Sequence, residues 1–287
     1  MEKEQNLEHW ESWAQTHGME LRATTKCMTI KRLEIEALSR QLDAHVDVNR
    51  STILEIGCGN GFNGFALTET FPSLCYLGLD FSGTMIENAA AIHGSGEARM
   101  AFAVQDARAL TLPYTINRSR PHKIGSVLGD RFPIKQFDAI FTDRMLINLA
   151  SAEEQLVVMS KIASAVRPGG VFLMLENSSE SHAGLNVIRE ALGLAPRAPA
   201  SYNVFIDERE VIEPFKDEMK LAATEYISGM HDLMLYAAAP AAGNGEVEYD
   251  SPLMIKLTQA LLRLNESGSS EIKGLGQNVL WVWQKIQ

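Results

Sequence analysis

Short apolar runs alternate with longer amphipathic stretches through the middle of this chain. Each run ends at or beside a glycine or an acidic residue, which is typical of strands bounded by turns. The stretches between the runs have apolar residues at helical spacing. This alternation predicts an α/β fold built on a doubly wound sheet. Its strands are expected at 52–56, 76–80, 100–105, 137–142 and 171–176.

A helical segment precedes this core. Trp10 and Trp13 share one face of a short helix, and we expect them to anchor that helix on the core. Thr24 or Thr25 is expected to cap a second helix, which runs from Met28 to Asp43. We therefore expect residues 1–49 to form a helical segment that covers the cofactor site of the core.

A second helical segment interrupts the core before its last strand. A sixth strand at 221–227 and a seventh at 278–283 are separated by a largely helical stretch. Long insertions in compact domains are usually lids or disordered, and this one is too apolar for disorder. We therefore expect a cap over the substrate. We expect four parts. Residues 1–49 form the N-terminal helical segment, and residues 50–227 form the core, with an irregular insertion at 112–135. Residues 228–274 form the cap, and residues 275–287 form the last strand.

The end of the first predicted strand carries the strongest chemical signal. Glu55 is followed by a turn through Gly57, Gly59 and Gly61 into a helix. Glycine has no Cβ, so this backbone turns tightly and approaches a ligand closely. The helix start then offers unpaired N–H groups. Asp80 ends the second strand nineteen residues after Gly61, where an acid accepts hydrogen bonds from ribose hydroxyls. These residues predict a pocket for a nucleoside-bearing cofactor.

At these positions the chain resembles the class I S-adenosylmethionine (SAM)-dependent methyltransferases. Their first motif, an acid followed by three alternating glycines, is complete here, and the resemblance runs from about Thr25 to Asn177. It implies that Glu55 and the glycine loop, which includes Cys58, lie beside the methionine end of SAM. It also implies that Asp80 binds the ribose and that Asp106 lies near the adenine. A small side chain that points into the core explains Cys58 at least as well as a reactive thiol.

The topology adds further candidates for the cofactor site. In open α/β sheets the ligand lies beyond the carboxyl ends of the strands, at the switch point between strands one and four. Phe81 follows the ribose acid and suits stacking on adenine, and Met85 lies one helical turn later. Ala107 and Thr142 follow or end the third and fourth strands. Core packing is the alternative for Phe81 and Met85.

A nicotinamide dehydrogenase is the competing interpretation. Gly59, Gly61 and Gly64 fit the dinucleotide fingerprint G-x-G-x-x-G. In that fingerprint the strand runs directly into the first glycine, whereas here the apolar run stops at Ile56. An acid at position 55 would gain nothing beside a pyrophosphate, but it suits the sulfonium and ammonium groups of SAM. The methyltransferase interpretation is therefore preferred.

Several segments resemble a subgroup of bacterial methyltransferases, many of which act on glycans. These segments are residues 143–149, 176–177, 185–189 and 202–205. The resemblance implies an acceptor-binding role for Arg144, Asn177, Asn186 and Arg189. The two arginines suit a carboxylate or phosphate on the acceptor, and structural salt bridges are the alternative.

A base would assist a hydroxyl acceptor, although SAM is already activated and the enzyme must chiefly align the reactants and exclude water. His182, just beyond the fifth strand, is the first candidate. His231 with Asp232, at the start of the cap, is the second. The alternative for each is a surface histidine with no role.

Composition narrows the choice of partner. The formal charge of −10 over 287 residues repels nucleic acid and anionic membranes. No apolar run approaches the roughly 18–20 residues of a membrane span, and the charged N-terminus lacks a signal-peptide segment. Three cysteines without a C-x-x-C pair indicate free thiols and a cytosolic protein. The scattered histidines predict no metal site.

The expected insertion at 112–135 is basic, although the chain as a whole is acidic. It carries Arg118, Arg120, His122, Lys123 and Arg131. A solvated face is one interpretation. A surface for an anionic acceptor, such as a nucleotide sugar or a phosphorylated glycan, is the other.

The sequence thus favours a SAM-dependent methyltransferase that moves a methyl group by direct displacement to a hydroxyl of a small-molecule or glycan-like acceptor, anionic acceptors included. N-methylation of an amino sugar or another amine is the first alternative, because one cleft serves either nucleophile. A non-catalytic SAM-binding partner of another enzyme is the second, because the glycine motif fits that role as well.

Overall fold

The computed structural model describes residues 3–18, 20, 23–93, 99–111, 136–266 and 274–286. A seven-stranded sheet forms the centre of the described chain, with the strand order β3-β2-β1-β4-β5-β7-β6. The basic insertion predicted at 112–135 lies outside the described residues. The strands are β1 Thr52–Ile56, β2 Cys75–Asp80, β3 Met100–Val104, β4 Phe137–Asp143, β5 Val166–Asn177, β6 Lys220–Tyr226 and β7 Asn278–Gln284.

The pairing of the strands confirms the predicted doubly wound sheet. β1 pairs in parallel with β2 on one side and with β4 on the other, so the strand order reverses there. β2 with β3 and β4 with β5 are also parallel. β7 is inserted between β5 and β6 and runs antiparallel to both. This strand order and these directions are the ones that the resemblance to class I methyltransferases implies.

The start of β5 differs from the prediction, which placed it after Pro168-Gly169-Gly170. Helix α6 does end at Ala165, but the strand already begins at Val166, which pairs with Phe137. The register with β4 then shifts before Val171 pairs with Ala139. Gly169 has a φ of 75°, and this left-handed residue lets the chain bulge and return to the sheet.

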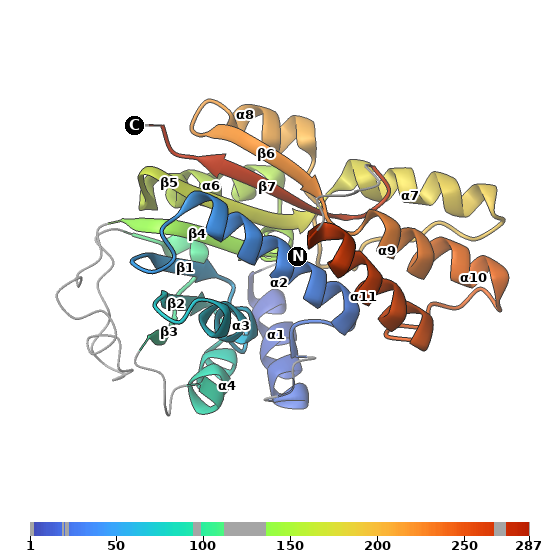
Figure 1. The fold of residues 1–287 in the computed structure, drawn as a ribbon, viewed down its shortest axis with the longest axis horizontal. Coiled ribbons are helices and arrows are strands. Elements are labelled where there is room, and N and C mark those ends of the chain that lie inside the picture. Colours follow the sequence, from blue (N-terminus) through green and yellow to red (C-terminus); the bar gives the residue numbers. More distant parts are fainter. Residues whose placement is uncertain are drawn as a thin grey trace.

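Helices cover both faces of the sheet and one of its ends (Figure 1). Helices α7, α9, α10 and α11 lie together at the end toward which the parallel strands point, and α2 crosses beside the sheet. The helices are α1 Lys3–His17, α2 Met28–His45, α3 Phe62–Thr70, α4 Gly83–His93, α6 Ala152–Ala165, α7 Ser179–Ala191, α8 Glu213–Phe215, α9 Gly229–Leu233, α10 Ala239–Ala242 and α11 Pro252–Glu266. The described chain also has 3₁₀ turns at η2 Ala107–Ala109 and η4 Leu146–Asn148, and π-helical turns at η5 Glu208–Ile212 and η6 Met234–Ala238.

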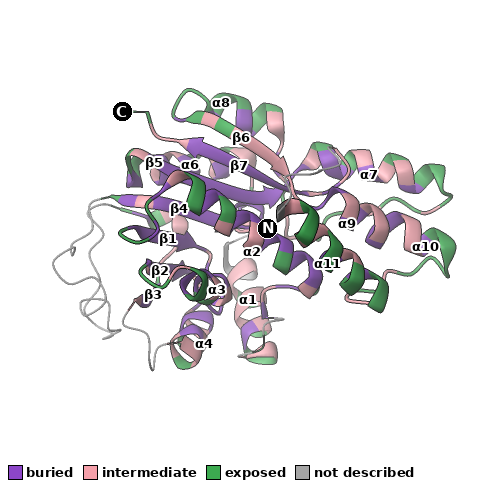
Figure 2. Cartoon of the chain, in the orientation of Figure 1, coloured by how far each residue is buried: buried purple, intermediate pink, exposed green. Residues whose placement is uncertain are grey.

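The core lies on the two faces of the sheet. Strands β1 and β7 are almost entirely buried, whereas the edge strand β6 has only intermediate and exposed residues (Figure 2). Successive residues of β1 point to opposite faces. Leu54 and Ile56 therefore join one apolar cluster, and Ile53 joins the other with Tyr76 and Phe141. Glu55 is on the same side of β1 as Ile53, so the alternation directs its carboxyl group toward the second cluster.

The cap of α2 differs from the prediction. Neither Thr24 nor Thr25 caps this helix; Cys27 is the N-cap residue and its side chain makes no capping bond. The carboxylate of Asp250 accepts hydrogen bonds from the N–H groups of Met28 and Thr29, at 3.2 and 2.9 Å. Thr25 instead accepts a hydrogen bond from the N–H of Cys27. A distant side chain has thus taken the place of the local cap.

Candidate cofactor and acceptor site

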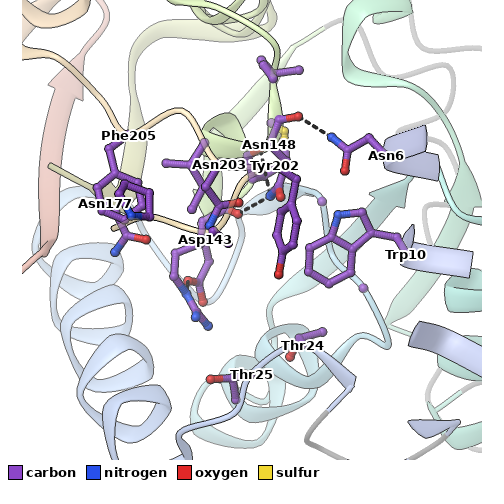
Figure 3. Close-up of a pocket in the computed structure, with 18 of the residues that line it drawn as sticks. Asn6, Trp10, Thr24, Thr25, Asp143, Asn148, Asn177, Tyr202, Asn203 and Phe205 are labelled. Atoms are coloured by element: carbon purple, nitrogen blue, oxygen red, sulfur yellow. Dashed lines mark hydrogen bonds and ion pairs between the residues drawn. The ribbon is translucent and has the colours of Figure 1, made fainter. Parts of the chain in front are cut away.

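A cavity of about 390 Å³ opens at the carboxyl ends of the strands. Residues from the glycine loop, the ends of β2, β4 and β5, helix α1 and the segment after α7 line it. Figure 3 shows Trp10 beside Tyr202, with Thr24 and Thr25 on the other side of the space. The cavity lies at the switch point between β1 and β4, where the topology predicts the ligand.

The glycine loop takes the conformation that its sequence predicts. Gly57, Gly59 and Gly61 have φ angles of 79°, 52° and 79°. A Cβ on Gly57 would overlap the side chain of Met145, and one on Gly59 would overlap that of Thr24. Gly57 and Gly59 line the cavity. Gly61 lies behind them as the N-cap residue of α3.

We expect Gly57→Ala to weaken S-adenosylhomocysteine (SAH) binding at least about tenfold and to destabilise the fold. An L-residue with positive φ costs about 1–2 kcal/mol, and the methyl group must also displace Met145. Isothermal titration and urea unfolding measure the two effects. Gly83→Ala is the matched control, because Gly83 starts α4 and a Cβ there would have its nearest neighbour 4.0 Å away. Equal SAH affinity in Gly57→Ala and wild type would contradict the prediction.

Asp80 lies against the glycine loop. Its carboxylate accepts the N–H of Gly59 at 2.9 Å and the N–H of Ser82 at 2.9 Å. Burial raises the pKa of Asp80 to about 6, although both hydrogen bonds favour the charged form. Asp80 also lines the cavity. The acid predicted to bind ribose is therefore fixed at the cavity wall by the loop that is predicted to approach SAM.

The remaining cofactor candidates at this end of the cavity follow β2 and β3. Phe81, Met85, Asp106 and Ala107 all line the cavity. Asp106 caps the short turn η2 and accepts two hydrogen bonds from the guanidinium of Arg108, at 2.9 and 3.0 Å. Met85 is 1% exposed and packs against the N-terminal helix, so it serves the core as well as the cavity wall.

Three other predicted cofactor residues do not line the cavity. The carboxyl of Glu55 is enclosed behind the loop, where Tyr76 and Asn63 donate hydrogen bonds to it. Burial raises the pKa of Glu55 to about 8, which removes most of the negative charge that the sequence argument assigned to it at neutral pH. Cys58 packs its thiol into the core, as its alternative interpretation proposed, and Thr142 is buried within β4.

A buried ionic cluster lies beneath the cavity. Lys31 of α2 contacts Asp143 at 2.5 Å and Glu34 at 2.7 Å, and Arg144 contacts Glu34 at 3.1 Å. Asn63 links Asp143 to Glu55. Burial alone would raise the pKa of Asp143, but the charges of Lys31 and Arg144 hold it below its usual range. The salt bridges of Arg144 match its structural alternative, although Arg144 also lines the cavity.

His231 and Asp232 form a hydrogen-bonded pair at the start of the predicted cap. Nδ1 of His231 lies 3.0 Å from Asp232, and Nε2 lies 3.0 Å from the hydroxyl of Thr29. Burial lowers the pKa of His231, but hydrogen bonds to Asp232 and Cys27 outweigh burial and raise the pKa to about 9. Asp232 lines the cavity and His231 lies behind it. A ring protonated at neutral pH has no lone pair with which to act as a base.

Helix α7 places His182, Asn186 and Arg189 along the segment that follows it. Nε2 of His182 and the amide of Asn186 both lie 2.9 Å from the carbonyl oxygen of Arg197. Arg189 donates to the carbonyl oxygens of Ala195 and Tyr236. His182 lines the cavity, whereas Asn186 and Arg189 do not. Asn186 and Arg189 donate their hydrogen bonds to backbone carbonyl groups, and their predicted role in binding the acceptor stays a prediction.

Aromatic rings cover the cavity on the side of α1. The ring of His9 lies 4.4 Å from that of Tyr202, and Trp10 lies 6.2 Å from the same ring. Asn6 donates to the carbonyl oxygen of Asn148 at 2.5 Å (Figure 3). Trp10 and Trp13 also pack against the core, as predicted. Sequence spacing indicated their shared face but not that the face also closes a cavity.

Several cavity residues were not predicted. Arg197, Tyr236 and Tyr249 also line the cavity, and all three come from the part of the chain that follows α7. Arg197 lies between Pro196 and Pro199. Proline restricts the backbone, so prolines on both sides of a residue stiffen the loop that holds it. This was the available signal in the sequence. Within the described ranges, no group of three His, Cys, Asp or Glu residues is placed to hold a metal ion.

A family model described as a methyltransferase domain matches residues 47–192, just over half of the chain. The chain belongs to this methyltransferase family. The match confirms the predicted family and enzyme class and SAM as the cofactor. The glycan-associated subgroup stays a prediction. No helix among the described residues has the length and apolar character required to span a membrane.

Relatives in sequence and structure agree with this assignment. A fatty-acid O-methyltransferase of Mycolicibacterium smegmatis is 29% identical over 133 residues, which are 45% of this chain and 38% of that protein. This chain therefore matches well under two thirds of that relative's length. A solved complex between the Haloferax volcanii Trm112 methyltransferase activator and a methyltransferase matches with a TM-score of 0.58 at 17% identity, over 97% of this chain and 98% of that chain.

The magnesium protoporphyrin IX methyltransferase of Synechocystis PCC 6803, solved with bound SAH, matches with a TM-score of 0.52 at 17% identity. The match covers 77% of this chain and 88% of that one. At these identities the likeness to the solved structures is one of fold. The acceptor must be argued from the site itself.

Proposed function

We propose that this protein transfers the methyl group of SAM to an oxygen of a small-molecule or glycan-like acceptor. The observation that carries the proposal is a single cavity with two kinds of lining, one suited to the cofactor and one suited to the acceptor. Gly57, Gly59 and Asp80 line it at the cofactor end, and Asn177, Phe205 and Arg197 are among the residues that line it where the acceptor would lie. This single cavity would therefore bring cofactor and acceptor together.

Oxygen is preferred over nitrogen as the accepting atom. The curated relative is named as an O-methyltransferase, which supports oxygen as the accepting atom here. An amine that is protonated at neutral pH must lose a proton before its lone pair can attack, and a hydroxyl also benefits from a base, so the cavity alone does not separate the two. N-methylation of an amine is therefore the first alternative that an acceptor assay must test.

The cavity residues align the reactants and exclude water. SAM supplies an activated methyl group when bound, so direct displacement requires mainly that the acceptor atom face that carbon. Trp10, Tyr202 and Phe205 present apolar surface that excludes bulk solvent. We propose the predicted cap at 228–274 as part of this enclosure, since it brings Asp232 and Tyr236 to the cavity.

His182 is the proposed base for a hydroxyl acceptor. Its Nε2 must carry the proton, because it contacts a carbonyl oxygen, so the lone pair is on Nδ1. Nδ1 is buried and accepts no hydrogen bond from another described residue. His231 is less suitable because its raised pKa keeps it protonated. Asp232 is then the residue that holds His231 in its charged form.

The test is a panel of hydroxyl, carboxyl and amine acceptors incubated with methyl-labelled SAM, with the added methyl group located by mass spectrometry. Label on oxygen supports the proposal. Label only on nitrogen would replace it by the alternative. Tight SAH binding without turnover on any acceptor would favour a non-catalytic role or a missing partner. The neighbour solved with a Trm112 activator makes addition of a purified activator of that type a useful arm.

A further inference from the structure

Arg197 enters the cavity with a charge that no neighbour neutralises. Its guanidinium stacks on the ring of Tyr236, with Cζ 3.5 Å from the ring centroid. Among the described residues, no carboxylate forms an ion pair with Arg197 and no acceptor receives a hydrogen bond from its guanidinium. Nη1 is fully buried and has no partner. A partly buried guanidinium with five unused N–H donors is costly unless an anion joins it.

The backbone around Arg197 is held more firmly than an ordinary loop. Residues 194–200 contain no helix or strand, yet Asn186 binds both the N–H of Arg197, at 2.8 Å, and its carbonyl oxygen, at 2.9 Å. His182 contacts the same carbonyl oxygen. Arg189 fixes the carbonyl oxygen of Ala195 and that of Tyr236, beneath the guanidinium. Three side-chain contacts thus hold the backbone of Arg197 itself, whose guanidinium has neither an ion pair nor a hydrogen-bond acceptor among the described residues.

The other cationic groups at the cavity have different surroundings. Arg108 is paired with Asp106 and Glu154, and Arg144 is paired with Glu34 and Asp143. Lys26 lies over the ring of Trp13, toward the N-terminal helix. Arg197 therefore combines a planar fork of donors, a stacking partner and a fixed backbone, which suits a two-oxygen anion.

We propose that Arg197 binds an anionic group of the acceptor, a carboxylate or a phosphate, at the side of the cavity formed by Tyr236 and Phe205. This inference rests on the proposed function, because it takes the cavity to hold an acceptor beside SAM. It assigns the anion to Arg197, in place of Arg144 and Arg189, whose hydrogen bonds go to protein groups. The stacked ring keeps the guanidinium oriented, and the rest of the acceptor extends from it toward the cofactor end.

The test measures binding of benzoate, phenyl phosphate and benzamide to the SAH-saturated protein by isothermal titration. The aromatic probes suit a cavity lined by Tyr202, Phe205 and Tyr236, and benzamide has the shape of benzoate without its charge. We expect at least one anionic probe to bind about tenfold or more tightly than benzamide. Which anion binds better distinguishes a carboxylate acceptor from a phosphorylated one.

Three variants make the result specific. Arg197→Gln should lose the preference for the anion, and Arg197→Lys should keep part of it, because the charge remains while the planar fork is lost. Arg209→Gln, which removes an exposed arginine elsewhere, should bind all three probes as wild type does. SAH affinity of each variant reports whether the fold is intact.

Two results would overturn the assignment. One is equal binding of benzoate, phenyl phosphate and benzamide, or no binding of either anion to protein that binds SAH. The other is an unchanged anion preference in Arg197→Gln. Failure of the wild-type protein to bind SAH is a separate outcome, which counts against the proposed function. In that case the anion preference is measured on the same protein without SAH and is judged by the same two criteria.

Discussion

Lys31→Met should lower the free energy of unfolding by about 3–5 kcal/mol, the cost of leaving buried charges unpaired. Lys31 contacts Asp143 and Glu34, and all three side chains are at most 3% exposed. Methionine fills a similar volume but carries no charge. Arg144 is then the cation that remains in this cluster for the carboxylates of Glu34 and Asp143. Urea unfolding at pH 7 measures the loss.

The matched control lies on the same helix. Arg40 pairs with Glu36 and Glu225, but its side chain is 40% exposed, so Arg40→Met should cost no more than about 1 kcal/mol.

The pH dependence of the stability loss in Lys31→Met separates lost charge from lost packing. In wild type, the pKa of Asp143 is lower in the folded protein than in the unfolded chain. This difference stabilises the fold above the pKa of the unfolded chain, and the stabilisation is lost as the pH falls. In Lys31→Met burial should raise that pKa, so the deficit should shrink between pH 7 and pH 5. A deficit that stays constant with pH would contradict the electrostatic account.

Asp80→Asn should weaken SAH binding about 100-fold. The variant keeps the shape of Asp80 but replaces one acceptor oxygen by an NH₂ group, which cannot accept both the Gly59 N–H and the ribose hydroxyls. Loss of hydrogen bonds to a charged group costs about 1.5–3 kcal/mol each. Isothermal titration with SAH gives the change directly. Asp138→Asn is the control: Asp138 also accepts a backbone N–H, from Thr52 at 2.7 Å, but it lies outside the cavity.

The pH dependence of SAH binding should follow the same residue. The pKa of Asp80 is raised to about 6, so the carboxylate form that binds ribose is lost as the pH falls through 6. Affinity should then fall about tenfold for each further pH unit, and this dependence should be absent in Asp80→Asn. In the unliganded protein the raised pKa acts in the opposite direction. There, Asp80 holds its proton more tightly in the native state than in the unfolded chain. Ionised Asp80 therefore lowers the stability of the fold above pH 6. It has no such effect below the pKa that Asp80 has in the unfolded chain. Equal SAH affinity at pH 5 and pH 7.5 would disprove the assignment.

Sequence pattern predicted the sheet closely, because each strand is an apolar run bounded by turn residues. The first strand was placed at its observed bounds, Thr52–Ile56, and the sixth and seventh within one residue of theirs. The start of β5 was missed because Pro168 and Gly169 usually end regular structure. Here the strand bulges through them instead. The cap of α2 was missed because Asp250 comes from the other end of the chain, and no local pattern reports such a contact.

The candidate site was predictable where backbone geometry defines it. Gly57, Gly59 and Asp80 reach the cavity because the turn itself places them there. Glu55 did not, since a single residue step along β1 directs its side chain into the core. The acceptor contacts of Asn186 and Arg189 stay predictions: a sequence does not show whether a polar side chain binds a ligand or a nearby carbonyl oxygen, and here both side chains bind carbonyl oxygens. Arg197 follows that segment and was overlooked.

The bond from Asp250 to the start of α2 has a consequence for how the polypeptide is assembled. The two partners are 222 residues apart, and Asn278 also donates to Glu34 on the same helix. Because the ribosome releases α2 well before Asp250 and Asn278, the N–H groups at the amino end of α2 lack the Asp250 cap until that later segment has been made. The final docking of α2 therefore follows the synthesis of Asn278, and the adjoining cavity is completed only after that point.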